Sequence, residues 1–416
     1  FVANVKQNKE VIKTIKRIVL THIYTEDLIM SNVTISESIK YIGADDTTLD
    51  LFESQYTIPN GISYNSYVIL DEKVAVMDTI DARKSEEWFN NLSNVLAGRN
   101  VDYIVISHLE PDHAANIKVL SDKYPDAKLV LSAKAKAMLP QFFAMDNLDD
   151  KCITVAEGQE LSLGTHNLKF IMAPMVHWPE VMLEYETTEK VLFSADAFGK
   201  FGALSASEDW TCEARRYYFN IVGKYGAPVQ ALLKKAATLD IKTICPLHGP
   251  VLKENIEFYI GKYLTWSSYE PEDDGVLVAC ASIHGNTKTA AEKMVDILKE
   301  KGFAKVAFID LTRNDMAEAI EDAFRYSRLI VAAASYDGDV FPPMEAFLNR
   351  LSHNTYQNRK VGIIENGSWA PTAGKCMKTA FEGMKNITIC GDTVTIKSTM
   401  KDEDITNMTK LAEAIK

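Results

Sequence analysis

The stretch that decides the fold is Ser107-His108-Leu109-Glu110-Pro111-Asp112-His113, which directly follows a short β-rich run at residues 103–106. It places four side chains that commonly bind metal ions within six positions, immediately after a predicted strand. Such closely spaced side chains converge on one point only if the backbone turns there, and Pro111 favours a turn. This stretch therefore predicts a metal site at the carboxyl end of a strand.

Three more candidate ligands follow other predicted strands. His177, Asp196 and His248 each come directly after a β-rich run. Strand ends can gather at one concave edge, and buried imidazoles and carboxylates that meet there need a cation, so a shared site is favoured over unrelated core residues. The full set has four imidazoles, three carboxylates and no thiolate: His108, Glu110, Asp112, His113, His177, Asp196 and His248.

This ligand set predicts two metal ions. Seven side chains are too many for one ion, and a bridging carboxylate suits two ions about 3.5–4 Å apart. Two zinc ions held mainly by imidazoles would serve a hydrolase, whereas a carboxylate share this high favours harder, redox-active iron or manganese. The residues alone leave the choice of metal open.

The second half of the chain has a different pattern. After an acidic stretch with proline and glycine at residues 269–275, short apolar runs alternate with helical segments, starting with a strand at residues 276–281. This alternation predicts a doubly wound parallel sheet, and hence an α/β multidomain protein. We expect an N-terminal extension of no assigned function over residues 1–32, a metal domain over residues 33–270 and a second domain over residues 271–416.

A phosphate-binding loop is predicted where the first strand of that sheet ends. Ser282-Ile283-His284-Gly285-Asn286-Thr287 offers hydroxyls, an amide and backbone N–H groups at a helix start, which suits a phosphate dianion. No lysine completes a Walker motif and no G-x-G-x-x-G run is present, so ATP and dinucleotides are disfavoured. A helix cap without a ligand is the alternative.

Two further loops are expected at the same crevice, outside the other strand ends. Tyr336 and Trp369 are planar side chains suited to contact with a flat ligand ring, and ordinary surface packing is an equally good explanation of both. The candidate residues of these loops are Ser335, Tyr336, Asp337, Gly338, Asp339, Asn366, Gly367, Ser368 and Trp369.

These motifs carry a resemblance to a known family. His108-x-Glu110-x-Asp112-His113 resembles the metallo-β-lactamase-like domain of flavodiiron proteins, and the hydrolases of that fold usually have His where this chain has Glu110. The loop at residues 282–287 resembles the FMN-phosphate loop of flavodoxins. The resemblance implies an N-terminal metallo-β-lactamase-like αββα sandwich, a C-terminal flavodoxin-like domain, and two iron ions and FMN as cofactors.

The resemblance also implies roles and partners. It divides the candidate ligands between two irons: His108, Glu110 and His177 on the first, Asp112, His113 and His248 on the second, and Asp196 bridging them. The family reduces dioxygen to water, nitric oxide to nitrous oxide, or both, which implies a detoxifying oxidoreductase. It further implies a head-to-tail homodimer, or a dimer of dimers, in which the flavin of one chain lies beside the irons of the other and Trp369 near the junction.

Composition limits the other partners. The chain has 45 basic and 57 acidic residues, a formal charge of −12, which disfavours nucleic acid and membrane surfaces. The six cysteines are scattered, which predicts free thiols in a reducing, cytoplasmic compartment. Because the sequence lacks the paired Cys-x-x-Cys runs of rubredoxin, we expect an external electron donor: rubredoxin, a flavoprotein reductase or a reduced deazaflavin.

Two other classes of function stay open. One is a dizinc hydrolase with an appended flavodoxin module, against which Glu110 argues. The other is an electron carrier or binding protein with a vestigial metal site, against which the intact ligand set argues.

Overall fold

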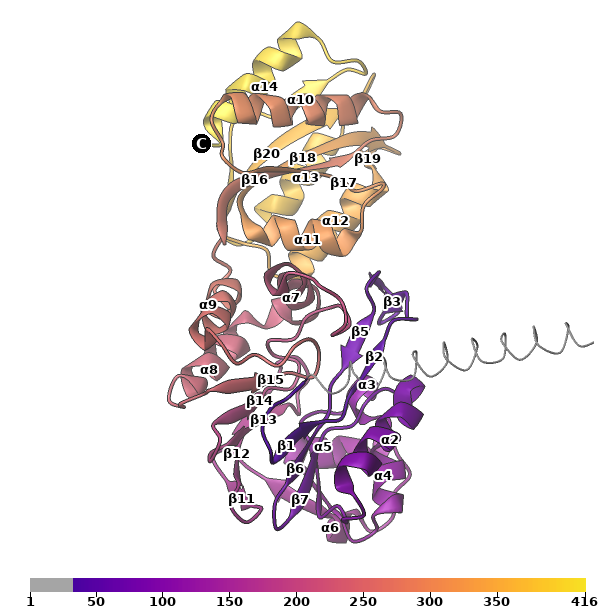
Figure 1. Cartoon of the computed structure of the whole chain (residues 1–416). Coiled ribbons are helices and arrows are strands. Elements are labelled where there is room, and N and C mark those ends of the chain that lie inside the picture. Colours follow the sequence, from indigo (N-terminus) through magenta and orange to yellow (C-terminus); the bar gives the residue numbers. More distant parts are fainter. Residues whose placement is uncertain (1–32) are drawn as a thin grey trace, which may run out of the picture.

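The structure, a computed structural model, describes residues 33–416 and has two parts, one built on two facing sheets and one on a single parallel sheet (Figure 1). The predicted extension at residues 1–32 lies outside the described residues. Within residues 33–416, no helix combines the length and hydropathy that a bilayer crossing requires.

Two sheets pack face to face in the first part. The first has the order β1 (Ile39–Tyr41), β6 (Tyr67–Leu70), β7 (Val74–Met77), β8 (Tyr103–Ile106), β9 (Lys128–Ser132), β10 (Cys152–Val155). The second has the order β11 (Glu160–Ser162), β12 (Asn167–Met172), β13 (Met182–Glu186), β14 (Val191–Phe193), β15 (Thr243–Cys245). Val105 and Val130 of the first sheet are buried with Phe170, Met182 and Phe193 of the second, so these residues form the core between the sheets.

Helices cover both outer faces. α2 (Ser85–Leu96) and α4 (Ile117–Lys123) share a buried cluster with the first sheet. α8 (Gly226–Ala236) and α9 (Ile256–Ser267) do the same for the second. The predicted αββα sandwich is therefore confirmed.

The short apolar runs of the sequence become strands because both of their faces are buried. In β8, Ile104 and Ile106 belong to the cluster under the helices, whereas Val105 faces the other sheet. A strand covered on both faces reads as a continuous apolar run, which is what residues 103–106 show. β7, β8 and β9 are parallel, so the loop that carries His108 begins at the same edge of the sheet where β7 and β9 end.

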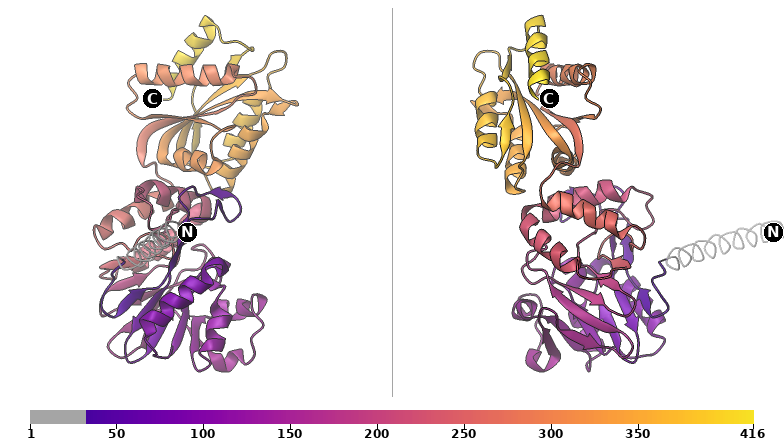
Figure 2. Two further views of the ribbon diagram at one scale, coloured as in Figure 1. Left: turned by 45° about the vertical axis from the view of Figure 1, so that its right-hand side comes forward. Right: turned by 90° about the vertical axis from the view of Figure 1, so that its left-hand side faces the viewer.

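The second part is a doubly wound sheet, as predicted. Its parallel strands have the order β17 (Val306–Asp310), β16 (Asp273–Ala281), β18 (Tyr326–Tyr336), β20 (Arg359–Asn366), β21 (Ile387–Ile389). Two short strands extend it: β19 (Asp339–Val340) is antiparallel to β18, and β22 (Val394–Ile396) is parallel to β20. α10 (Asn286–Glu300) and α14 (Asp402–Ala414) cover one face, and α11 (Met316–Arg325), α12 (Pro342–His353) and α13 (Ala373–Glu382) cover the other (Figure 2).

The two parts meet through buried ion pairs. α9 ends at Ser267 and β16 begins at Asp273, so the predicted division at residues 270 and 271 falls in this connection. Arg215 of α7 (Trp210–Tyr217) pairs with Glu272 of the connection at 2.7 Å and with Glu321 of α11. The pKa of Glu272 is lowered to about 2, because contacts with Arg215 outweigh the effect of burial. Charges across this junction are thus matched.

Arg215→Met is expected to destabilise the protein strongly. The substitution leaves Glu321, which is 2% exposed, without its partner. Breaking a buried pair in this way costs about 3–5 kcal/mol of unfolding free energy. Urea unfolding followed by circular dichroism measures the loss, and Lys118→Met, which breaks an exposed pair with Asp122, is the control. Equal losses in the two variants would contradict the assignment.

His166 ties the start of the described chain to the second sheet. Its Nδ1 lies 2.8 Å from Asp71 Oδ2 and its Nε2 lies 3.0 Å from Glu189 Oε1, which also accepts a hydrogen bond from Ser36. Burial acts to lower the pKa of His166, but the hydrogen bonds to Glu189 and Asp71 raise it above its ordinary value. His166 therefore has a structural role.

His166→Gln is expected to lower stability in a pH-dependent way. A pKa raised on folding stabilises the native state fully below about pH 6.5, and this contribution is lost as pH rises through the folded pKa. The difference in melting temperature between wild type and variant should be largest near pH 6, at the acid end, and should shrink in alkali. Thermal unfolding across pH measures it, with the exposed His353→Gln as control. A difference that does not change with pH would contradict a charged His166.

Candidate active site

The loop after β8 is shaped by a single helical turn, α3 (Pro111–Ala114). Glu110 precedes it in an extended conformation, and Pro111 occupies the first helical position, where its fixed φ and missing N–H are tolerated. The chain thus leaves the strand extended and then coils at once. The abrupt turn brings the side chains before Pro111 and those within α3 into one small space.

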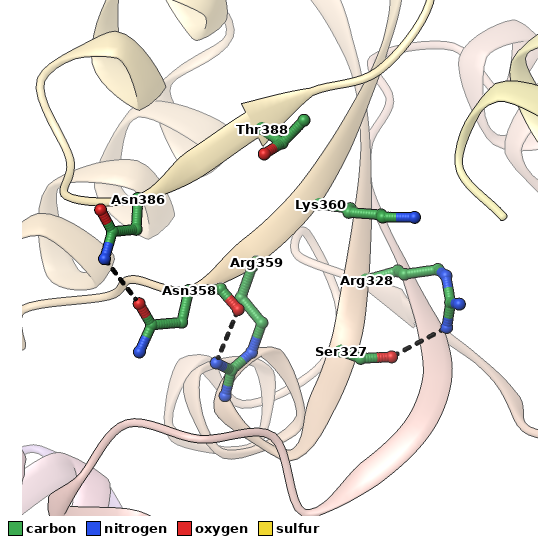
Figure 3. Close-up of a pocket in the computed structure, with 7 residues that line it drawn as sticks. All are labelled: Ser327, Arg328, Asn358, Arg359, Lys360, Asn386 and Thr388. Carbon is green, nitrogen blue, oxygen red and sulfur yellow. Dashed lines mark hydrogen bonds between the residues drawn. The ribbon is translucent and has the colours of Figure 1, made fainter.

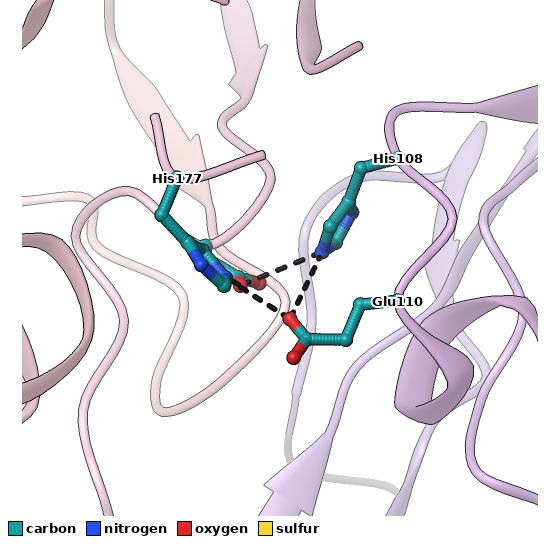
Figure 4. Close-up of side chains that lie close together, drawn as sticks. His108, Glu110 and His177 are labelled. Carbon is teal, nitrogen blue, oxygen red and sulfur yellow. Dashed lines mark hydrogen bonds and ion pairs between the residues drawn. The ribbon is translucent and has the colours of Figure 1, made fainter. Parts of the chain in front are cut away.

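The first group contains His108, Glu110, His177 and Asp196, whose ligand atoms all lie within 4.8 Å of one another. His177 Nε2 is 3.0 Å from Glu110 Oε2 and 2.9 Å from Asp196 Oδ2. His108 Nε2 is 3.7 Å and 3.5 Å from the same two carboxylates. Figure 4 shows His108 and Glu110, from one loop, and His177, from another segment, pointing toward one another.

The second group contains Asp112, His113 and His248. His113 Nε2 lies 3.3 Å from Asp112 Oδ2 and 3.0 Å from His248 Nε2, and His248 Nε2 lies 3.3 Å from Asp112 Oδ2. Asp196 reaches this group as well, because its Oδ1 lies 3.3 Å from His113 Nε2. The structure therefore brings all seven predicted side chains together, with Asp196 in contact with both groups.

The unpaired atoms of this cluster fit a pair of metal ions. Among residues 33–416, five buried atoms of these seven side chains lack a hydrogen-bond partner: His108 Nε2, His113 Nδ1, both carboxylate oxygens of Asp112, and Asp196 Oδ1. Buried nitrogen and oxygen atoms without partners are costly unless a cation lies between them. The chemistry of the donors, imidazole nitrogen and carboxylate oxygen, is that of a transition-metal site.

Opposite charges dominate the electrostatics. Burial acts to raise the pKa of Glu110, but the neighbouring imidazoles of His108 and His177 lower it to about 2. Burial acts to lower the pKa of His177, but Asp196 and Glu110 raise it to about 10. Burial likewise opposes ionisation of Asp196, yet His108, His113 and His177 hold its pKa well below the ordinary value. Glu110 and Asp196 are thus ionised, which is the state in which a carboxylate binds a metal ion.

Two buried carboxylates outside the seven hold the ligand loop. Asp78 Oδ1 accepts the Ser107 N–H at 2.8 Å, and Glu180 Oε1 accepts the Leu109 N–H at 3.0 Å. Glu180 follows His177 by three residues. The same segment therefore supplies one candidate ligand, His177, and holds the loop that carries His108 and Glu110. Sequence reasoning missed Asp78 and Glu180, because a carboxylate bound to a distant backbone leaves no local motif. The only sequence signal that could have pointed to either residue is an acidic side chain next to an apolar one.

His248 is oriented by its surroundings. Its Nδ1 donates to the Ser63 carbonyl at 2.7 Å, which leaves Nε2 for the cluster. The rings of Phe52 and Tyr217 lie 5.4 Å and 5.6 Å from its ring. This aromatic wall limits the access of water to one side of the site.

The predicted flavin-binding residues lie at one edge of the second sheet. Ala281 pairs with Ala333, and Ala334 pairs with Asn366, so the carboxyl ends of β16, β18 and β20 lie side by side. The predicted residues from Ser282 to Trp369 lie at these three strand ends or shortly after them. The topology therefore gathers the three predicted segments, as expected for a ligand crevice of an open parallel sheet.

The first loop fits a phosphate group. α10 begins at Asn286, so Asn286 and Thr287 belong to its first turn, and no side chain caps that turn. Ser282 Oγ accepts the Gly285 N–H at 3.0 Å, and Gly285 has a φ of 97°, which favours glycine. The uncapped backbone N–H groups at this helix start are the donors that an anion needs.

The other two loops have divided roles. Ser335 Oγ accepts the Thr372 and Ala373 N–H groups, and Asn366 bonds twice to Ser398, so both residues shape the loops. Tyr336 and Trp369 are 45% and 93% exposed. Both aromatic rings are therefore accessible to a planar ligand. Their contact with a flavin ring stays a prediction.

A separate pocket of about 260 Å³ lies at the opposite end of this sheet. It is lined by Ser327, Arg328, Asn358, Arg359, Lys360, Asn386 and Thr388 (Figure 3). Arg359 is buried, and its guanidinium donates to the carbonyls of Tyr326, Tyr269 and Gln357. It is therefore satisfied within the fold and belongs to neither candidate site.

Known proteins match this arrangement. A family model described as "ODP family beta lactamase" matches residues 62–249, which contain all seven clustered side chains. An uncharacterized protein of Methanocaldococcus jannaschii is 28% identical over 385 residues, 91% of this chain and 96% of that protein. A nitric oxide reductase of Moorella thermoacetica is 27% identical over 394 residues, 92% and 98% of the two chains.

Solved structures agree with the sequence relatives. Rubredoxin oxygen:oxidoreductase of Desulfovibrio gigas has a TM-score of 0.84 and 25% identity, with 92% of this chain and 97% of that chain covered. The flavodiiron protein of Giardia intestinalis, at 23% identity, shares the fold with a TM-score of 0.83 over 92% and 95% of the two chains. In its αββα sandwich, its second, parallel sheet and its clustered candidate ligands, the chain is thus similar to the flavodiiron proteins.

Proposed function

We propose that this protein reduces dioxygen to water, nitric oxide to nitrous oxide, or both, at a pair of iron ions that receive electrons from FMN. The observation that carries the proposal is the contact of Asp196 with two groups of metal-ligating side chains, in a chain that also holds a phosphate-binding loop. The names of the relatives support it, since one is a nitric oxide reductase and another a rubredoxin oxygen:oxidoreductase.

The geometry suggests one assignment of ligands. His108, Glu110 and His177 would hold one iron, Asp112, His113 and His248 the other, and Asp196 would bridge them. His113 belongs in the set because its Nε2 is 3.3 Å from both Asp112 and Asp196. When bound, two ferrous ions and a reduced flavin supply four electrons, enough to convert one dioxygen to two waters.

The protein's own residues prepare the site for this chemistry. Burial, with the charges of Asp196 and Glu110, raises the pKa of Tyr217 well above its ordinary value. Its hydroxyl therefore keeps its proton at neutral pH and serves as a hydrogen-bond donor beside the cluster. Phe52 and Tyr217 exclude water on the His248 side. A dizinc hydrolase is less supported, because Glu110 replaces the usual histidine and the named relatives are redox proteins.

We extend the proposal to assembly and electron supply. The two sites are built on separate sheets, and Trp369, Tyr336 and Ile283 expose apolar surface at the flavin edge. A head-to-tail homodimer, or a dimer of such dimers, would cover this surface and place the flavin of one chain beside the irons of the other. An external donor, either rubredoxin, a flavoprotein reductase or a reduced deazaflavin, would deliver electrons in the cytoplasm.

Anaerobic stopped-flow oxidation tests the reaction. Fully reduced protein is mixed with dioxygen or nitric oxide, and the flavin absorbance and the products are followed. We expect rapid oxidation by at least one gas, with water or nitrous oxide as product. Slow flavin oxidation with release of hydrogen peroxide, together with no consumption of nitric oxide, would contradict the proposal.

Mixing two inactive variants tests the assembly. One variant lacks a metal ligand and the other cannot bind the flavin phosphate, so each alone is inactive. In a head-to-tail dimer, reassembled mixtures regain part of the activity, because one of the two junctions joins an intact flavin to intact irons. Mixed dimers without any regained activity would contradict this arrangement.

A further inference from the structure

The loop that carries His248 follows a strand of the second sheet and is held by a segment that leads into the first sheet. The loop comes directly after β15. The segment that holds it runs from β5 (Ile62–Tyr64) into β6. Three alternate residues of this segment bond to the loop, namely Ser63, Asn65 and Tyr67, and all three are fully buried. The contact therefore links the two sheets at the metal cluster.

Asn65 holds the loop on both sides of His248. Its Nδ2 donates to the Pro246 carbonyl at 2.8 Å and to the Gly249 carbonyl at 2.7 Å. Its backbone N–H donates to the Leu247 carbonyl at 2.8 Å. One buried residue thus fixes the backbone two residues before, one residue before and one residue after the candidate ligand.

The orientation of the Asn65 amide is itself fixed. Carbonyl oxygens only accept hydrogen bonds, so the NH₂ group of the amide must face the loop. The Tyr41 hydroxyl donates to Asn65 Oδ1 at 3.1 Å, which holds the other side of the amide. Ser63 assists, because its Oγ accepts the Gly249 N–H at 2.7 Å and its carbonyl accepts from His248 Nδ1. The amide therefore has one orientation, and so has the loop.

The second group of ligands depends on this link because its members come from both sheets. Asp112 and His113 follow β8 of the first sheet, whereas His248 follows β15 of the second. His248 Nε2 lies 3.3 Å from Asp112 Oδ2 and 3.0 Å from His113 Nε2. In the first group, Glu180 makes a comparable link to the ligand loop. Asn65 is the corresponding link for the second group.

We propose that Asn65 is a positioning residue, whose amide sets the place of His248 and thereby the affinity of the metal ion in the second group. This inference rests on the proposed diiron function. A partner that orients a metal ligand contributes about 10–100-fold to metal affinity. Because Asn65 acts through one ligand, its loss should weaken one of the two ions and spare the other.

Asn65→Leu removes the amide and keeps the side chain at nearly the same size. Ferrous iron is titrated anaerobically into metal-free protein against a chromogenic chelator. We expect one ion to bind about 10–100-fold more weakly than in wild type and the other to bind as before. Mössbauer spectra of protein loaded with iron-57 identify the affected ion, and the weakened signal should be the one that His248→Ala removes.

Asn220→Leu is the matched control. The Asn220 amide also donates to two backbone carbonyls, those of Arg216 and Ala317, at 2.8 Å and 3.1 Å, but at the junction between the two parts. We expect this variant to lower the midpoint of urea unfolding of the metal-free protein and to leave both iron affinities at the wild-type values. The pair of variants thus separates a loss of stability from a loss of ligand position.

Two further variants complete the test. In His248→Ala, adding Asn65→Leu should not weaken the remaining ion, because the route through His248 is already lost. Ser63→Ala removes one hydrogen bond of the loop and should weaken the same ion by about tenfold, so it carries the test if Asn65→Leu does not fold.

Wild-type affinity for both ions in the folded Asn65 variant, or equal weakening of both, would overturn the proposal. Where Ser63→Ala carries the test, the same two results in that variant would overturn it. Wild-type protein that does not bind two irons refutes the diiron function itself. Wild-type protein with two irons and an Asn65 variant that matches it refute only the role of Asn65.

Discussion

Asp196→Ala is expected to remove both metal ions and abolish activity. Asp196 contacts both groups, with Oδ1 3.3 Å from His113 and Oδ2 2.9 Å from His177. Its loss would leave three imidazoles without the carboxylate they share and would take one ligand from each ion. Loss of an outer partner alone weakens metal binding about 10–100-fold, so loss of a shared ligand should exceed about 100-fold.

Iron analysis by mass spectrometry measures this directly. Wild-type protein should contain two irons per chain after anaerobic reconstitution and desalting, and the variant close to none. Glu257→Gln, an exposed acid on α9, serves as the control and should match wild type. Circular dichroism verifies that the Asp196 variant is folded. A folded Asp196→Ala protein with two tightly bound irons would contradict the bridging role.

Ser282→Asp is expected to abolish FMN binding and to leave the irons in place. Ser282 Oγ accepts the Gly285 N–H at 3.0 Å, and an aspartate oxygen can accept the same bond, so the loop should keep its shape. The added charge would face the phosphate of the flavin. Two unit charges about 4 Å apart repel by about 4 kcal/mol at an effective dielectric constant of 20, which corresponds to about a thousandfold loss of affinity.

Fluorescence titration of flavin-free protein with FMN measures the affinity. Ser282→Asn has nearly the same shape without the charge, and we expect it to stay within about tenfold of wild type. The difference between the two variants isolates the electrostatic effect. Equal FMN affinity in the aspartate and asparagine variants would show that the phosphate binds elsewhere.

The strand ends and the clustering of the candidate ligands could be predicted from the sequence because they have local signatures. Residues 103–106 form a buried strand, and the residues after it change abruptly to polar types with a proline. The same change follows β16, where a small polar loop precedes α10. In both places the apolar run indicates a strand and the turn-forming residues after it indicate the strand's end. A local pattern is therefore enough to predict where each strand ends.

Other elements could not be predicted, because tertiary contacts decide them. β13 contains Glu184 and Glu186, both fully buried, and a strand with two acids has no clear apolar period. Glu186 is satisfied by the backbone N–H groups of Asn167, Thr188 and Glu189, which a sequence pattern cannot indicate. Asp78 and Glu180 escaped prediction for the same reason. Each acts through a partner that is distant in sequence.

Anomalous diffraction at the iron edge, on crystals of the reconstituted protein, tests the central claim most directly. We predict two iron peaks about 3.5–4 Å apart on either side of the Asp196 carboxylate. His108, Glu110 and His177 should surround one peak, and Asp112, His113 and His248 the other. A single peak, or two peaks that do not share Asp196, would contradict the account.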